Sequence, residues 1–121
     1  MKVIIDTNGL MVQAQFGVDV FDELARLGYY ECVIPSAVID EMNAIEKKLK
    51  GKDRIALAVA SSLSKRCHVV EASGPADEVI FELAQEMNVP VFTNDAQLRK
   101  RLKDAGIRTI YLRSKHKLEI D

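Results

Sequence analysis

Four acidic residues occupy positions from which their carboxylates could share one site. Asp6 and Asp95 each follow a short apolar run, whereas Glu41 and Asp77 lie on the inward edges of segments with helical spacing. Converging carboxylates raise one another's pKa unless a cation compensates, and magnesium and manganese prefer such oxygen ligands. An ion held in this way can activate water and stabilise a phosphodiester under attack. The pattern predicts a Mg²⁺ or Mn²⁺ site that hydrolyses nucleic acid, with Asp6, Glu41, Asp77 and Asp95 as metal-binding and catalytic residues.

Small polar residues flank two of these acids. Thr7 and Asn8 follow Asp6, and Thr93 and Asn94 precede Asp95. Side chains of this kind orient metal-binding carboxylates and hold bound waters. We therefore expect the four residues to support the acids.

Each acid also has a simpler structural explanation. Asp95 could cap a helix, Asp77 could interact with a helix dipole, and Glu41 could lie on a solvated flank. Asp6 is the hardest to explain in this way, because it ends a buried apolar run. The metal site is favoured by the four positions taken together.

Apolar runs and helical stripes alternate along the chain and indicate the elements that would position the acids. Helical stripes lie in residues 17–28, from Ser36 as a candidate N-cap to residue 49, in 55–63, and after Pro75 and Asp95. Strand-like runs cover residues 2–5, 31–35, 68–70, 89–93 and 108–112, and residues 113–121 read as a polar tail.

This alternation predicts an α/β fold, a three-layer sandwich around a five-stranded parallel sheet. If the chain winds outward through three strands and then returns, its fourth strand lies beside the first. The switch point between those two strands is where open α/β sheets bind ligands. Asp6 and Asp95 would then face each other across it.

The composition is that of one globular domain spanning residues 1–121. Hydrophobic residues make up 48% of the chain, and no apolar stretch reaches the roughly 18 residues of a membrane span. We expect a soluble, cytoplasmic protein that does not bind membranes. Cys32 and Cys67 show no metal-ligand spacing and are predicted to be buried reduced thiols, with a disulfide as the alternative.

The net charge of −1 hides two basic segments. Lys50, Lys52 and Arg54 belong to a lysine-rich turn, and the second segment extends from Arg99 to Lys117. Cations beside an acidic metal centre suit a polyanion whose backbone is held while one phosphate meets the metal. Lys50, Lys52 and Arg54 are therefore predicted to bind RNA, and solvated helix faces are the alternative.

The motifs around these acids resemble those of the PIN-domain family of ribonucleases over nearly the whole chain. Ile5-Asp6-Thr7-Asn8 is similar to the first family motif, the segment from Pro35 to Glu41 to the second, Ala76-Asp77 to the third, and Val91 to Asp95 with Leu98 to the fourth. The resemblance implies a single PIN-like nuclease domain: a metal-dependent endoribonuclease that cuts single-stranded RNA, with these acids at its centre and homodimers common.

Within the family, Gly51-Lys52 and Tyr111-Leu112-Arg113 look most similar to archaeal proteins related to ribosomal-RNA-processing PIN nucleases. VapC-like toxins of toxin–antitoxin pairs share the same core. The resemblance therefore leaves open an RNA-processing role or a toxin role with an antitoxin partner.

Two other classes of protein compete with this interpretation. A phosphoacceptor receiver domain needs an acid pair after its first strand and an Asp after its third strand. In this chain Asp6 alone follows the first strand, and Glu71-Ala72-Ser73 follows the third. A catalytically silent PIN-like module that binds RNA or protein is the remaining alternative, and a measured metal affinity distinguishes it.

Overall fold

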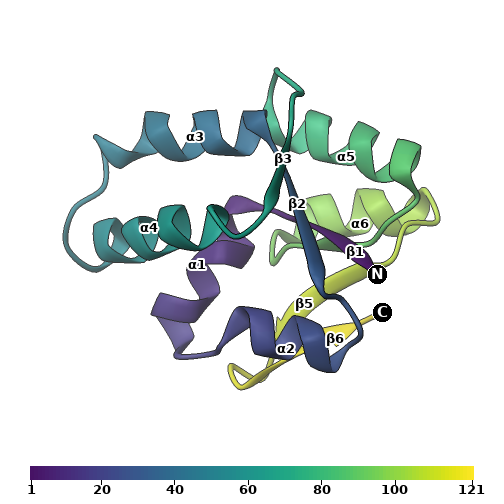
Figure 1. Ribbon diagram of the computed structural model, residues 1–121, viewed down its shortest axis with the longest axis horizontal. Helices are drawn as coiled ribbons and strands as arrows, with labels where there is room; N and C mark the ends of the chain where they lie inside the picture. Colours follow the sequence, from purple (N-terminus) through teal and green to yellow (C-terminus); the bar gives the residue numbers. More distant parts are fainter.

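The computed structural model describes all residues, 1–121, and the chain alternates between strands and helices (Figure 1). In chain order the elements are β1 (Lys2–Ile5), α1 (Thr7–Phe16), α2 (Val20–Arg26), β2 (Glu31–Pro35), α3 (Ser36–Glu46), α4 (Gly51–Ser64), β3 (His68–Val70), α5 (Ala76–Met87), β4 (Val91–Phe92), α6 (Ala96–Asp104), β5 (Thr109–Arg113) and β6 (Lys117–Ile120).

One sheet with the order β3-β2-β1-β4-β5-β6 organises these elements. The central strand β1 pairs in parallel with β2 and β4, so that Ile4 lies beside both Val33 and Val91. Because the chain runs outward to β3 and then returns to β4, the switch point lies between β1 and β4, as predicted. Val3, Ile4 and Ile5 are fully buried, as expected of a strand covered on both faces.

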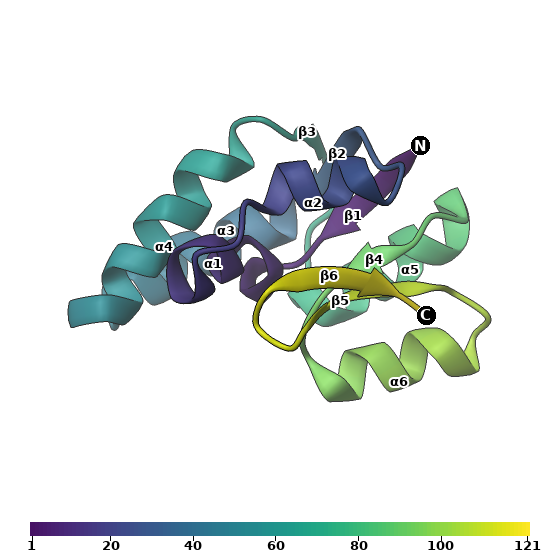
Figure 2. The same cartoon turned by 90° about the horizontal axis from the view of Figure 1, so that it is seen from below.

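Helices cover both faces of the sheet. Figure 2 shows α5 and α6 together on one side and α1 to α4 on the other, and α4 packs along α1. Connections between parallel strands are right-handed. Because the strands are added in one direction up to β3 and in the opposite direction from β4 onward, the connecting helices lie on opposite faces. The three-layer α/β sandwich predicted from the sequence is confirmed.

The sheet has six strands, not five, and the last one is antiparallel. Lys117–Ile120, predicted as part of a polar tail, pairs with β5 so that Leu118 lies opposite Leu112. Ser114 and Lys115 turn the chain with φ angles of 57° and 63°, which is the conformation of a tight hairpin. Leu118 is fully buried and secures the strand.

The first helix, α1, was not predicted. Its opening residues Thr7, Asn8 and Gly9 show no apolar stripe, yet Thr7 and Gly9 are buried. Gly9 lets the helix approach the sheet, since a Cβ at this position would lie 3.0 Å from the Phe92 carbonyl oxygen. The helix ends at Gly17 in the left-handed conformation, with φ 68°.

The prediction of two reduced cysteines is wrong. Cys32 and Cys67 form a disulfide, their Cα atoms are 4.8 Å apart, and no free cysteine remains. The parallel register that pairs Val33 with His68 places the residues before them side by side. The bond ties β2 to the edge strand β3.

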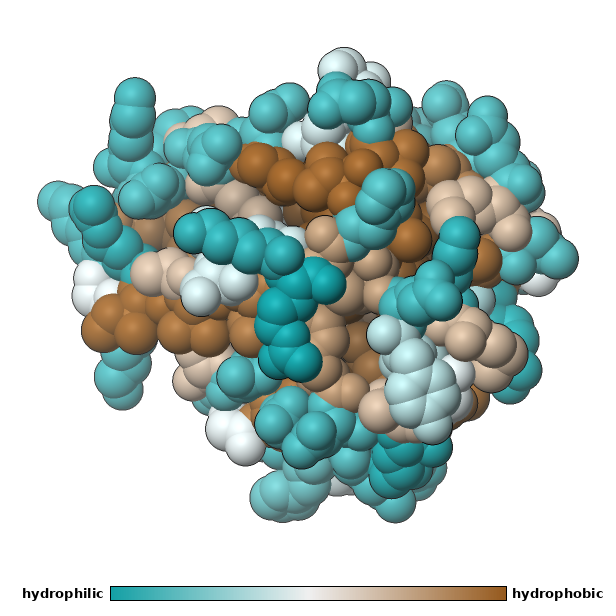
Figure 3. Space-filling view, viewed as in Figure 1, coloured by the Kyte–Doolittle hydropathy of each residue, from teal (hydrophilic) through white to brown (hydrophobic).

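The surface combines hydrophilic cover with small apolar areas. On the face shown in Figure 3, hydrophobic side chains gather around β3, where Val69 is 40% exposed. No helix is long and apolar enough to span a membrane.

Candidate functional site

All four predicted acids follow the carboxyl ends of parallel strands. Asp6 directly follows β1, Asp95 comes three residues after β4, Glu41 lies in α3 behind β2, and Asp77 lies in the first turn of α5 behind β3. We call this edge of the sheet the acid edge. A hydrogen bond of 2.9 Å from the Thr93 hydroxyl to Asp6 spans the switch point between β1 and β4.

Asp6 is the most enclosed of the four. The residue is 4% exposed, and its carboxylate accepts hydrogen bonds from the Thr7 backbone N–H (2.8 Å), the Thr93 hydroxyl (2.9 Å) and the Asn8 amide (3.2 Å). The bond from Thr7 also caps α1. Every donor is uncharged, so the carboxylate is held in place without being neutralised.

The pKa values show how the acids act on one another. Burial raises the pKa of Asp6 from 3.8 to about 6; hydrogen bonds from Thr93 and Thr7 oppose the rise, and the charges of Glu41 and Asp77 add to it. Asp77 is only partly shielded from water, but this shielding also raises its pKa, and the charge of Asp95 raises it further. The four acids therefore form one electrostatic group.

Glu41 rather than its neighbour Asp40 belongs to this group, as the helical spacing predicted. The Thr7 hydroxyl donates to Glu41 over 2.8 Å, and Glu41 is half-buried whereas Asp40 is exposed. Thr7 thus connects the start of α1 to α3. The sequence indicated Thr7 as a supporting residue but not its partner.

A second set of polar contacts fixes the segment between β4 and α6. The Asn8 side-chain oxygen accepts from the Asn94 backbone N–H (2.9 Å), and the Thr93 hydroxyl accepts from the Asp95 N–H (3.1 Å). The Asn94 side chain in turn accepts from the backbone N–H of Leu112 over 2.9 Å. This anchor on β5 had no signal in the sequence, because it depends on the order of the strands.

Asp95 and Asp77 are less enclosed than Asp6. One Asp95 oxygen caps α6 by accepting from Gln97 N–H (2.9 Å) and Leu98 N–H (3.1 Å), and the other has no hydrogen bond within the chain. Asp77, expected on the inward face of its helix, is exposed instead. The capping explanation for Asp95 therefore accounts for only one of its two oxygens.

The donor set suits a hard divalent cation, although no three acidic, histidine or cysteine side chains lie close enough together to hold an ion directly. Mg²⁺ commonly keeps several waters and is bound through one or two carboxylates. Burial is the main cause of the raised pKa values of Asp6 and Asp77, and repulsion from neighbouring acids adds to it; a cation at this edge would relieve that repulsion. The acids therefore fit an ion held partly through water.

The two basic segments differ in how their charges are used. Lys50, Lys52 and Arg54, at the start of α4, are exposed and form no ion pair. In the second segment, four cations pair with acids: Arg101–Glu78 (2.7 Å), Arg113–Glu119 (2.9 Å), Arg99–Asp121 (3.2 Å) and Lys103–Asp121 (3.4 Å). Only the first segment keeps all its cations free of ion pairs.

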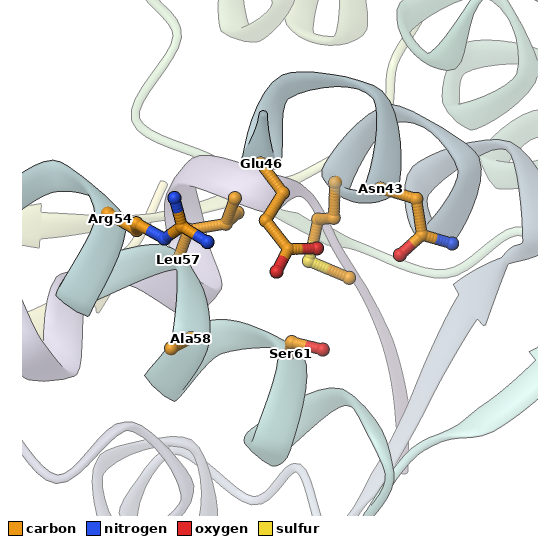
Figure 4. A pocket seen from close by; sticks show the side chains of 7 residues that line it. Asn43, Glu46, Arg54, Leu57, Ala58 and Ser61 are labelled. Carbon is orange, nitrogen blue, oxygen red and sulfur yellow. The ribbon is translucent and has the colours of Figure 1, made fainter. Parts of the chain in front are cut away.

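Arg54 also lines a hollow of about 200 Å³ between α3 and α4 (Figure 4), together with Met42, Asn43, Glu46, Leu57, Ala58 and Ser61. Glu46 follows Glu41 by five residues, which places it about 140° around the helix. The hollow thus lies on the face of α3 turned away from the acid edge.

The fold and these side chains define a class of protein: an α/β domain with an acidic site at the switch point of its parallel sheet. The family described as "PIN like domain" matches residues 3–115. The chain belongs to this PIN-like family.

Named relatives agree with this assignment. The chain is 29% identical to Ribonuclease VapC9 of Archaeoglobus fulgidus over 118 residues, which cover 98% of this chain and 87% of the relative. It is 32% identical to Ribonuclease VapC4 of Methanocaldococcus jannaschii, covering 98% and 95%. The solved structure of the PIN domain endonuclease Utp24 superposes with a TM-score of 0.77 and 26% identity, covering 99% of this chain and 90% of that one.

Proposed function

We propose that the protein is a metal-dependent endoribonuclease that hydrolyses single-stranded RNA. The observation that carries the proposal is Asp6, a carboxylate held only by uncharged donors, with its pKa raised to about 6 mainly by burial and further by Glu41 and Asp77. The names of the two relatives, both ribonucleases, and of the endonuclease Utp24 support the same activity.

In this proposal Asp6, Glu41, Asp77 and Asp95 hold Mg²⁺ or Mn²⁺. The bound ion would lower the pKa of a water and stabilise the charge of the attacked phosphodiester. The residues around the acids fix their positions: Asn8 and Thr93 hold Asp6, and Thr7 holds Glu41. Asn94 links this group to β5.

Lys50, Lys52 and Arg54 are the cations proposed to grip the RNA backbone, because they are exposed and form no ion pair. Both α1 and α3 start at the acid edge, and α4, which carries these cations, packs against both. Phosphates held there would leave the neighbouring part of the strand free to reach the acids.

The VapC names of the two relatives favour the toxin role with an antitoxin partner, whereas the description of Utp24 as an endonuclease is compatible with either role. We include both roles, together with a cytoplasmic homodimer, in the proposal. Both roles require ribonuclease activity, and a cleavage assay with the purified protein tests that activity first.

The assay compares the parent with Asp6→Asn and with Asp40→Asn, an exposed acid one residue from Glu41. We expect Asp6→Asn to cut single-stranded RNA more than about a hundredfold more slowly, since even residues behind a metal ligand contribute about 10- to 100-fold. Asp40→Asn should retain the parent rate, and excess chelator should abolish cleavage. Full cleavage in chelator, or by Asp6→Asn, contradicts the proposal.

A further inference from the structure

We propose that Ser36 is a positioning residue that fixes the helix of Glu41 relative to the helix of Asp77; the inference rests on the proposed function. The Ser36 hydroxyl donates to the Ala72 carbonyl oxygen (3.1 Å) and accepts from the Ala72 backbone N–H (3.0 Å). The Ala37 N–H adds a third bond, 3.0 Å long, to the same carbonyl. We call these three bonds the Ser36 clamp.

The clamp joins the segments that lead to two of the acids. Ser36 is the first residue of α3 and precedes Glu41 by five residues, whereas Ala72 lies in the loop before α5 and precedes Asp77 by five. The two helices also pack against each other. The bonds therefore link the start of one acid-bearing helix to the approach of the other.

Apart from the Ala37 N–H bond, no backbone hydrogen bond joins the two segments beyond the end of the sheet pairing. The pairing of β2 with the edge strand β3 covers three residue pairs and ends where Pro35 meets Val70. Beyond that pair, the Ser36 hydroxyl serves as donor and acceptor for a single residue of the neighbouring segment. A side chain thus extends the connection past the end of the sheet, toward the acid edge.

Ser36 was predicted to be the N-cap of its helix, but in the structure its hydroxyl bonds to Ala72 instead. The capping position is Pro35, and no side chain caps the helix. Because the hydroxyl forms both of its bonds with Ala72, its loss affects the neighbouring segment as well as the helix end. This distinguishes a positioning role from ordinary capping.

Ser64 provides a matched control. Ser64 is buried whereas Ser36 is half-buried, and the Ser64 hydroxyl forms one short bond of 2.6 Å to the Ser61 carbonyl oxygen within α4. Ser64→Ala therefore removes a hydroxyl and a hydrogen bond without affecting the segments that carry the acids. Ser36→Thr keeps the hydroxyl and tests rescue.

The experiment measures the cleavage rate, the Mg²⁺ concentration for half-maximal rate, KM and the melting temperature of the parent, Ser36→Ala, Ser36→Thr and Ser64→Ala. Both alanine variants should melt at lower temperature than the parent. Only Ser36→Ala should lower kcat or raise the Mg²⁺ requirement, by about tenfold or more, with little change in KM. Ser36→Thr should recover most of the loss.

A second measurement tests the clamp without relying on catalysis. In metal-free protein, Ser36→Ala should speed amide hydrogen exchange at Ala72 and in the first turn of α5, whereas Ser64→Ala should not. If the parent neither cuts RNA nor responds to Mg²⁺, the proposed function fails, and exchange alone decides whether the clamp exists. Equal kinetics and equal exchange in the two alanine variants would overturn the inference.

Discussion

The acid edge and the charged surface formed by α6, the β5–β6 hairpin and Glu78 of α5 place their carboxylates in opposite electrostatic surroundings. At the acid edge, burial and neighbouring acids raise the pKa values of Asp6 and Asp77. On the other surface, hydrogen bonds from Arg101 and Arg113 lower the pKa values of Glu78 and Glu119.

Asp121 makes the contrast clearest, because it is also partly buried. Burial alone would raise its pKa, but hydrogen bonds from Thr109, Arg99 and Lys103 hold it below its usual value. Asp6, by comparison, receives bonds only from uncharged groups. Neutral donors fix a carboxylate while leaving its charge uncompensated, and this is the condition in which a cation binds best.

The largest expected difference between the two regions is their response to Mg²⁺. A ligand that binds only the folded parent stabilises it by about 2.7 kcal/mol at a hundredfold excess over its Kd. Asp95→Asn should respond much less, because asparagine can still cap α6 but lacks the charge. Thermal melts of both proteins with Mg²⁺ and with chelator test this, and an equal shift in the two would remove Asp95 from the site.

A smaller effect should appear in the pH dependence of stability. The pKa of Asp6 is about 6 in the folded protein and near 3.8 in the unfolded chain, so a neutral Asp6 favours the folded state. That contribution is fully present below about pH 4 and is lost as the pH rises through about 6. The free energy of unfolding of Asp6→Asn, measured relative to that of the parent, should therefore rise by on the order of 2 kcal/mol between pH 4 and pH 7.5.

Urea unfolding in chelator at the two pH values measures this relative gain. Asp40→Asn controls for the loss of one surface charge, because its side chain is exposed. If the free energies of unfolding of Asp6→Asn and the parent differ by the same amount at both pH values, ionisation of Asp6 does not destabilise the folded protein.

The smallest expected effect concerns the cations. On single strands each phosphate contact contributes about −0.7 to the log–log slope of RNA affinity against salt, so Lys50→Ala with Lys52→Ala should flatten the slope by about 1.4. Arg101→Ala with Arg113→Ala should change it little, because Glu78 and Glu119 already pair with these arginines. Titrations of a labelled RNA at several salt concentrations compare the two double variants. A larger change of the salt slope in the arginine variant than in the lysine variant would assign RNA binding to the second basic segment.

The sequence predicted the parts of the fold that depend on local patterns. The apolar run from Val3 to Ile5 indicated the central strand, and the return of the chain placed β4 beside it. The first helix was missed because its opening residues Thr7 and Gly9 are buried for their small size rather than their hydrophobicity. The last hairpin was missed because Ser114 and Lys115 adopt positive φ without a glycine to mark the turn.

The candidate site divides in the same way. Asp6 and Glu41 could be selected by position, since one ends a strand and the other faces inward from a helix. Their partners could not, because the bonds from Thr7 to Glu41 and from Leu112 to Asn94 join residues whose proximity depends on the packing of whole elements. A strand register likewise brought Cys32 to Cys67, and no spacing in the sequence encodes it.

The Cys32–Cys67 disulfide has a consequence for how the enzyme must be handled. The bond spans a sequence separation of 35 residues, and this segment contains Glu41, Ser36 and the basic turn. Cross-linking a loop of that length reduces the conformational entropy of the unfolded chain by an amount worth about 4 kcal/mol. A reducing agent added to protect the protein would remove this constraint from the segment that carries Glu41 and the proposed RNA-binding cations, so assays in oxidised and in reduced buffer would sample two proteins of different stability.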